Sequence, residues 1–113
     1  MDFRKQKPIY LQIAERLMEQ VLAGQLAADD RMPSVRDVAV SMGVNPNTVV
    51  RTFDYLQGEE IIFNRRGVGY FVAGDAKERI LALQRKEFLE EELPLILQKM
   101  KLLGIDLKEL ERS

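Results

Sequence analysis

Three polar residues, Asn47, Thr48 and Arg51, have the types and spacing to contact the edges of base pairs. Arginine can donate two hydrogen bonds to guanine, and asparagine can bond adenine in the same bidentate way. At about 100° per residue, a helix would place Asn47 and Arg51 opposite an apolar stripe that includes Val49 and Phe53. The pattern predicts a recognition helix, whose first turns enter the major groove. An ordinary surface helix of a helical domain is the other interpretation.

The residues before this helix predict a shorter helix and a tight turn. Ser34 can cap a helix start, and Asp37 lies three residues on, where it can reach back. Gly43 follows where a helix should stop, because glycine adopts the left-handed conformation at little cost. Asn45 is a good second N-cap, with Pro46 at the first helical position. The apolar face of the shorter helix comprises Val35, Val38, Ala39 and Met42.

A supporting helix is predicted from Ile9 to about Gly24, since its apolar residues recur with helical spacing. We expect it to pack behind the helix-turn-helix. Its apolar stripe comprises Tyr10, Ile13, Ala14, Leu17 and Val21. The residues from Leu26 to Met32 are predicted to form a loop, in which the neighbouring acids Asp29 and Asp30 belong to a turn. Two neighbouring carboxylates supply too few oxygens for a metal site.

Two short β-branched and aromatic runs follow, Ile61–Phe63 and Tyr70–Val72, and they predict a β-hairpin. Such a hairpin would be the wing of a winged helix. Arg65 and Arg66 are expected at its tip, where arginine suits the negative potential of a narrow minor groove. Gly67 would let the backbone approach the duplex closely. The alternative of a nucleotide-binding loop lacks the required strand-loop-helix context.

After Gly74 the composition becomes strongly helical. Its apolar residues step by four and three, which is the seam spacing of packed helices. These residues are Leu89, Leu93, Ile96, Met100 and Leu103. Pro94 should kink this helix or split it in two. Gly104 should end it, and Asp106 can cap a last short helix.

The helical tail is too short to bury this seam against itself, because small helical segments bury little surface. Either the body of the domain or a second copy of the chain must cover it. We favour a second copy, which gives a two-fold dimer. Two recognition helices would then lie about one turn of DNA apart, or a multiple of it, on an inverted repeat.

Composition limits the remaining classes of function. The 113 residues suit one compact domain or a small domain with an extension, and no membrane or signal segment is recognisable, so a cytoplasmic protein is expected. Cysteine and histidine are both absent. We therefore expect no transition-metal site, no cofactor and no enzymatic activity of the usual hydrolytic kind. The net charge of −1 argues mildly against nucleic acid, so affinity must come from the placement of basic residues.

Four motifs, in the same order, resemble the DNA-binding domain of the GntR family of bacterial transcription regulators. They are Pro8-Ile9-Tyr10-Leu11-Gln12-Ile13, Pro33-Ser34-Val35-Arg36-Asp37, Met42-Gly43-Val44-Asn45-Pro46-Asn47-Thr48-Val49 and Arg65-Arg66-Gly67-Val68-Gly69-Tyr70-Phe71-Val72. The resemblance covers roughly residues 8 to 73. The short tail is similar to that of the YtrA-type branch, which lacks the large effector-binding domain of other branches.

The resemblance implies a mainly α protein with a small β-hairpin. A winged helix-turn-helix domain, residues 1–74, would precede a helical dimerisation tail, residues 75–113. The function implied is that of a homodimeric regulator, expected to repress. The DNA-contacting residues would be Ser34, Arg36, Asn45, Asn47, Thr48, Arg51, Arg65, Arg66 and Gly67.

Three alternatives stay open from the sequence. Arg36 could be a surface arginine paired with Asp37, which would be worth little. The winged helix could serve as a protein-interaction module without DNA, since a fold does not fix a function. A small-molecule effector of unknown identity would have to bind between domain and tail or at the dimer seam, because the tail alone is too small for a pocket.

Overall fold

The computed structural model describes residues 7–112, which form two compact units. The first unit is Lys7–Leu81, and the second begins at Ala82. Helices dominate both, and the one sheet of the described residues is a two-stranded antiparallel hairpin. This confirms the predicted class of a mainly α protein with a small β-hairpin. None of the helices described between Lys7 and Arg112 is both long enough and apolar enough to cross a membrane.

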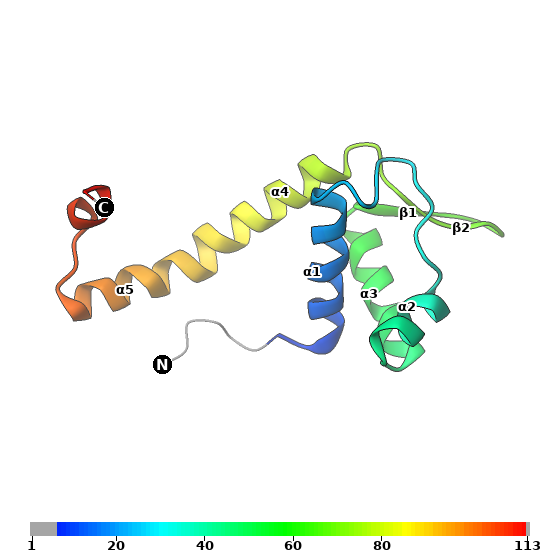
Figure 1. Cartoon of the computed structure of the whole chain (residues 1–113), viewed down its shortest axis with the longest axis horizontal. Helices are drawn as coiled ribbons and strands as arrows, with labels where there is room; N and C mark the ends of the chain where they lie inside the picture. The colour runs from blue at the N-terminus through cyan, green and yellow to red at the C-terminus, as the bar shows by residue number, and fades with distance from the viewer. Residues whose placement is uncertain (1–6, 113) are drawn as a thin grey trace. The chain divides into compact units, whose positions relative to one another are not determined.

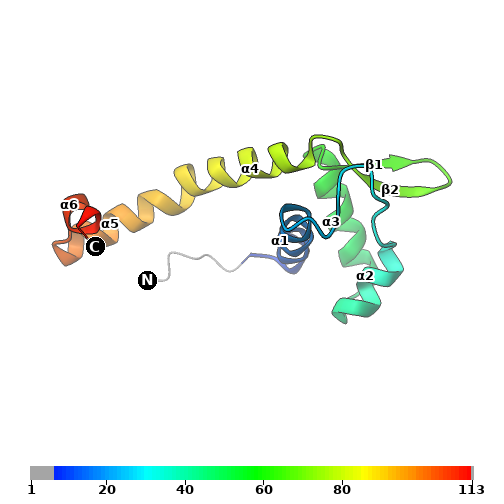
Figure 2. The same cartoon turned by 45° about the horizontal axis from the view of Figure 1, so that its top comes forward.

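Three helices build the core of the first unit (Figures 1 and 2). Helices α1 (Ile9–Leu22) and α3 (Pro46–Gly58) lie side by side, and α2 (Val35–Met42) packs against α3. Burial of their apolar stripes is the main force that holds them together. The buried side chains are Ile13, Ala14, Leu17, Met18 and Val21 of α1, Val38 and Ala39 of α2, and Val49, Phe53 and Leu56 of α3. The predicted α1 stripe is confirmed except for Tyr10, which is half-buried.

The turn between α2 and α3 has the predicted caps. The Ser34 Oγ accepts a hydrogen bond from the Asp37 amide at 3.0 Å, which satisfies a free donor of the first turn of α2. Gly43 ends α2 in the left-handed conformation, with φ at 65°. The Asn45 Oδ1 then accepts from the Asn47 amide at 2.8 Å and starts α3. These local bonds fix the direction in which α3 leaves the turn.

We expect Ser34→Ala to lower the free energy of unfolding by about 1 kcal/mol, because the cap bond is lost. Urea unfolding at one fixed protein concentration measures the change. Ser41→Ala is the matched control, since Ser41 is an exposed residue of the same helix and alanine is the better helix former there. Equal unfolding midpoints for wild type and Ser34→Ala would show that the cap adds nothing.

The hairpin pairs β1 (Ile62–Arg65) with β2 (Gly69–Val72). Ile62 and Val72 are buried toward the helices, while Phe63 and Phe71 stack at 5.8 Å on the other face. The strands extend further toward the tip than predicted, and this corrects the position of Arg65. Arg65 is the last residue of β1 and pairs with Gly69, so that the turn contains only residues 66 to 68. A bond from the Val68 amide to the Arg65 carbonyl, 2.9 Å, closes this tight turn.

The segment before α2 is more than the loop that was predicted, because residues 29 to 32 form hydrogen bonds with β2, with Arg31 opposite Phe71. The Met32 amide donates to the Tyr70 carbonyl at 2.8 Å, and the Val72 amide donates to the Asp30 carbonyl at 2.9 Å. The prediction that the acids belong to a turn is confirmed, since Asp29 has a left-handed φ of 67° and the Asp30 carboxylate accepts from the Ala27 amide at 2.8 Å. The pairing attaches the wing to the residues that lead into α2.

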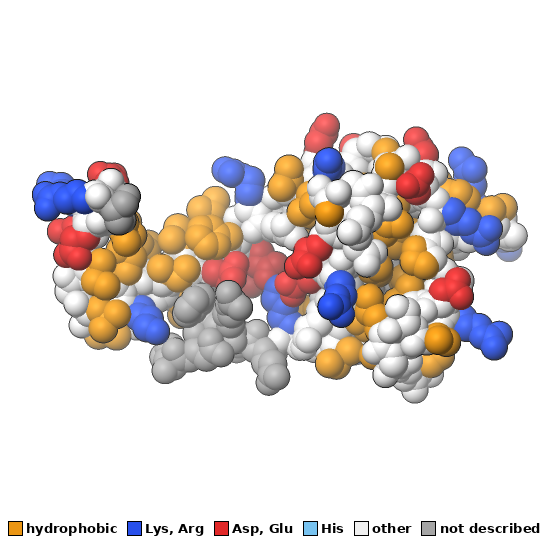
Figure 3. Space-filling view, viewed as in Figure 1, with side chains coloured by type: hydrophobic (Ala, Val, Ile, Leu, Met, Phe, Trp, Pro, Cys, Tyr) orange, Lys and Arg blue, Asp and Glu red, His pale blue; other side chains and the backbone are white. Residues whose placement is uncertain are grey.

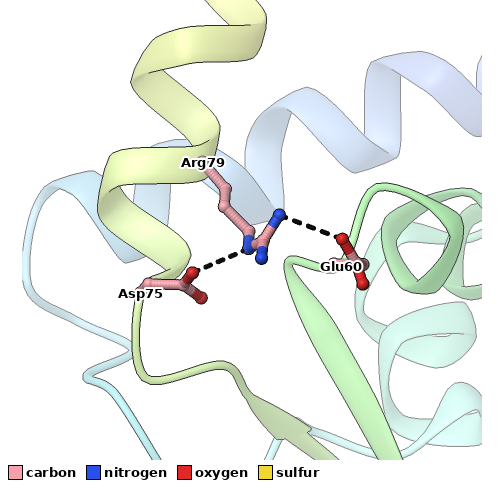
Figure 4. Close-up of polar contacts among 3 residues, drawn as sticks. All are labelled: Glu60, Asp75 and Arg79. Carbon is pink, nitrogen blue, oxygen red and sulfur yellow. Dashed lines mark hydrogen bonds and ion pairs between the residues drawn. The ribbon is translucent and has the colours of Figure 1, made fainter.

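An arginine joins the end of α3 to the start of α4 (Ala76–Glu87), as Figure 4 shows. The Arg79 Nε lies 2.9 Å from the Asp75 Oδ2, and its Nη1 lies 3.0 Å from the Glu60 Oε2. The hydrogen bond that Arg79 donates to the Asp75 carboxylate, followed by the negative charges of Asp75 and Glu60, raises the pKa of Arg79 above its ordinary value. Because these groups are exposed, the contact orients the α4 start more than it stabilises the fold.

The second unit is a succession of helices. The later part of α4 is followed by η1 (Phe88–Glu92), α5 (Leu93–Leu103) and α6 (Leu107–Glu111). Pro94 does not split the helix, since the backbone stays helical through Glu92 and Leu93, and the predicted disturbance takes the form of the π-helical turn η1 directly before α5. Proline lacks a donor and crowds the carbonyl four residues earlier, so the wider turn accommodates it. Gly104 ends α5 with φ at 70°, and Asp106 caps α6, both as predicted.

None of the side chains described between residues 82 and 112 is fully buried. Figure 3 shows hydrophobic side chains open to solvent along α5. Among the predicted seam residues, Leu89 is 52% exposed and Leu103 is 63% exposed. Leu93, Ile96 and Met100 are half-buried. An apolar surface of this kind costs free energy unless something covers it.

Candidate nucleic-acid interface

Helix α3 exposes one face near its N-terminus and buries the other. The predicted stripe of Val49, Phe53 and Leu56 is buried, which confirms that part of the pattern. Thr52 joins it, a residue that the apolar pattern missed, and its Oγ1 donates to the Tyr10 carbonyl at 2.7 Å. This bond fixes the rotation of α3 against α1. The exposed residues of the first two turns include Asn47, Val50, Arg51 and Asp54.

Asn47 is the most available of the predicted base-reading side chains. Its backbone amide is used by the Asn45 cap, but its side chain is exposed and forms no hydrogen bond among the described residues. The Asn45 Oδ1 is occupied by the cap, which leaves its amide nitrogen as a donor. Thr48 is half-buried beside them, and its carbonyl lies 3.2 Å from the Thr52 hydroxyl. The start of α3 therefore offers a free carboxamide with both donor and acceptor atoms.

Arg51 lies toward α1 rather than at the centre of the exposed face. Its guanidinium carbon is 4.1 Å from the centre of the Tyr10 ring, a cation–π contact. The Tyr10 ring in turn meets Tyr55 edge-on at 6.4 Å. Sequence spacing could not detect this contact, because Tyr10 and Arg51 come from different helices. Arg51 remains exposed, so it is held at the rim of the face with its charge in solvent.

The start of α2 supplies a second polar edge. Arg36 is exposed in the first turn, directly after the Ser34 cap. The alternative of a pair with Asp37 is not observed, since no ion pair involves Arg36 among residues 7–112. The free guanidinium and the amides of this helix start are suited to a phosphate group.

The wing contains the two predicted arginines, Arg65 and Arg66, and a third arginine contacts it from the segment before α2. Arg66 and Gly67 are exposed in the turn, and Gly67 has φ at 78°, which favours glycine. Arg65 is exposed too, and its guanidinium carbon lies 4.7 Å from the centre of the Phe71 ring, so the outer face of the hairpin holds it.

The arginine that contacts the wing is Arg31, whose role was not predicted from the sequence. Its Nη2 donates to the Val68 carbonyl at 2.6 Å, which braces the turn. A Cβ atom added at Gly69 would lie only 3.2 Å from the Arg31 Nε, and Gly69 has φ at 139°. Glycine is therefore required there both for conformation and for the passage of Arg31. In the sequence, the glycine at position 69 was the available signal that another side chain passes close to the hairpin.

These elements define a class. A capped helix-turn-helix, a second helix that exposes a carboxamide at its start, and an arginine-bearing hairpin together make a winged helix-turn-helix protein of the DNA-binding type. The chain belongs to the GntR family, since residues 9–72 match the family described as "Bacterial regulatory proteins, gntR family". It is thus a DNA-binding transcription regulator by family, and the relatives described next are regulators rather than enzymes.

Relatives match nearly the whole chain. It is 36% identical to the uncharacterized HTH-type transcriptional regulator YhcF of Bacillus subtilis, over 96% of this chain and 88% of that protein. It is 32% identical to the HTH-type transcriptional repressor YtrA of Bacillus subtilis, over 97% of this chain and 84% of that one. A crystal structure of a GntR-family regulator from Bacteroides thetaiotaomicron superposes with a TM-score of 0.81 at 46% identity, covering 93% and 91% of the two chains. The resemblance to the YtrA-type branch is thereby confirmed.

Proposed function

We propose that this chain is a homodimeric repressor that binds an inverted-repeat operator. DNA binding is supported above all by the exposed side chain of Asn47 at the start of α3, which forms no hydrogen bond among residues 7–112, together with the exposed Arg36 at the start of α2. Repression is supported by the similarity to YtrA, which is named a repressor. A regulator of this kind works where the chromosome is, so we place it in the cytoplasm.

The two parts of the chain and the predicted DNA-contacting side chains would have separate roles. Residues 1–74 would bind DNA, and residues 75–113 would join two copies. The side chains of Asn45, Asn47, Thr48 and Arg51 would supply the major-groove contacts and those to adjacent phosphates. Ser34 and Arg36 would anchor the DNA backbone, and Arg65, Arg66 and Gly67 would form the wing contact. Arg51 would stay stacked on Tyr10 in this arrangement, so a phosphate at the rim suits it better than a base edge.

The homodimer is supported by the apolar seam of the second unit. Leu89 and Leu103 are more than half exposed within one chain, at a spacing typical of packed helices. A second copy would cover Leu89, Leu93, Ile96, Met100 and Leu103 with the same residues of its own, as two-fold symmetry requires. The two α3 helices would then meet successive major grooves on one side of the duplex.

Selection of bound DNA from a random pool tests the proposal. The full chain should enrich sequences with two copies of one short motif in inverted orientation, at a constant spacing near one helical turn or a multiple of it. A single unpaired motif would contradict the dimer, and a pool without enrichment would contradict sequence-specific binding. Selection at low salt is the right condition, because basic and acidic side chains balance in the DNA-binding unit and non-specific affinity should fall quickly with salt.

A further inference from the structure

Val50 is an aliphatic side chain in the middle of the exposed face of α3. It is 43% exposed, whereas its neighbour Val49 is completely buried. Helical spacing already assigns Val49 to the buried stripe, and the structure adds that Val50 lies exposed between Asn47 and Asp54. If α3 enters the major groove as proposed, the apolar side chain of Val50 faces the duplex, at the place where recognition helices carry their base contacts.

The neighbours of Val50 leave it as the central group of this face. Asn47 precedes it by three residues and Asp54 follows it by four, so the three side chains form one row along the helix. Arg51 lies beside the row, but its guanidinium is held over Tyr10 at 4.1 Å. The surface offered to DNA one turn into α3 is thus a carboxamide, then an aliphatic patch, then a carboxylate.

Only one base presents an apolar group in the major groove, and that base is thymine with its 5-methyl group. A valine can neither donate nor accept a hydrogen bond. The polar edge of another base placed against it would lose water without a replacement partner. An aliphatic side chain at this place therefore favours thymine and penalises its competitors.

We infer that Val50 reads the methyl group of one thymine in each half-site of the operator. The inference rests on the proposed function, because it takes α3 as the helix in the major groove. It adds a specificity-determining residue that hydrogen-bonding chemistry alone would not identify. On α3, Asn47 would then contact one base through hydrogen bonds, and Val50 would contact the methyl group of the neighbouring base.

Replacement of thymine by deoxyuridine tests this, since the exchange removes the methyl group and keeps the base pair. Each thymine of the selected operator is replaced in turn, and the dissociation constant is measured by fluorescence anisotropy. Wild type should bind about fourfold more weakly when one particular thymine of a half-site is replaced, the effect of one buried methyl group. Replacement in both half-sites should weaken binding by about fifteenfold, because separated positions add. The other thymines serve as internal controls.

Variants of Val50 and Asn47 test whether the effect of the thymine methyl group depends on Val50. Val50→Ala should bind the thymine and deoxyuridine operators equally, and Val50→Thr, which keeps one γ-methyl group, should retain part of the difference. Asn47→Ala should keep the full methyl effect on its weaker binding. Thermal unfolding of Val50→Ala should match wild type, since the side chain is exposed.

Two outcomes would overturn the inference. One is a wild-type affinity that no thymine exchange lowers, including the case of a half-site without thymine. The other is a methyl effect that persists unchanged in Val50→Ala. Failure of the proposed function would look different, because wild type would then enrich no inverted repeat before any base analogue is used.

Discussion

The double variant Leu93→Glu/Ile96→Glu is expected to be a folded monomer that binds its operator about a hundredfold more weakly than wild type. Both side chains lie on the apolar seam of α5, which buries none of its residues within one chain. Two carboxylates on each copy would face their equivalents across the two-fold axis, where like charges repel and cannot be hydrated. Without the dimer each half-site binds alone, and the gain from linking two binding sites disappears. Sedimentation equilibrium gives the mass, and anisotropy gives the operator affinity.

The same helix provides the controls for this prediction. Gln98→Glu adds a carboxylate on an exposed position away from the seam, so the dimer and the operator affinity should persist. Leu103→Glu changes a side chain that is 63% exposed in one chain and should weaken the dimer without affecting the fold of the monomer. Circular dichroism checks helicity in all three variants. A double variant that remains a dimer would place the interface elsewhere.

Asn47→Ala is expected to lower affinity for the operator by about 1–3 kcal/mol in each half-site while leaving affinity for random DNA nearly unchanged. The Asn45 cap bonds the backbone amide of Asn47, so truncation of the side chain leaves the cap intact. The loss therefore reports the contact with a base and not a loosened helix. Titrations of operator and random duplexes at several salt concentrations separate these effects.

Arg36→Ala is the matched comparison for Asn47→Ala. If Arg36 contacts a phosphate, its removal should weaken binding to both duplexes by similar factors and reduce the salt slope by about one for each half-site. Equal losses on operator and random DNA for Asn47→Ala would assign Asn47 to the backbone as well. A smaller salt slope for Asn47→Ala, with its preference for the operator over random DNA unchanged, would also assign Asn47 to the DNA backbone.

The sequence predicts the helix-turn-helix accurately because its determinants are local. Ser34, Gly43 and Asn45 act on the few residues around them, and their caps form as expected. The buried stripe of α3 also follows from helical periodicity alone. A disturbance of the helix near Pro94 is predicted for the same reason, since a missing donor acts on its own turn. That it takes the form of a π-helical turn and not of a split depends on how the carbonyls rearrange, which residue types do not specify.

The features that the sequence could not supply all join segments that are distant in the chain. The stacking of Arg51 on Tyr10 needs α1 beside α3, and the bond from Arg31 to Val68 needs the hairpin beside the residues before α2. Periodicity separates Val49 from Val50, but the exposed fraction of Val50 depends on how the other helices cover α3. The position of Arg65 could not be predicted, because the end of β1 is defined by the pairing of Arg65 with Gly69 on the other strand. Side chains at the edges of the site are therefore the least predictable from periodicity.

The pairing of residues 29 to 32 with β2 restricts where this chain can change in length. Successive residues of a strip that pairs with a strand point to opposite sides, so one residue inserted between Asp30 and Met32 would exchange the places of Arg31 and Met32. Met32, now 4% exposed, would turn to solvent, and the guanidinium would be driven into the core. Insertions and deletions between α1 and α2 should therefore be tolerated only before Asp29, where the chain from Gly24 to Ala28 is exposed apart from half-buried Leu26.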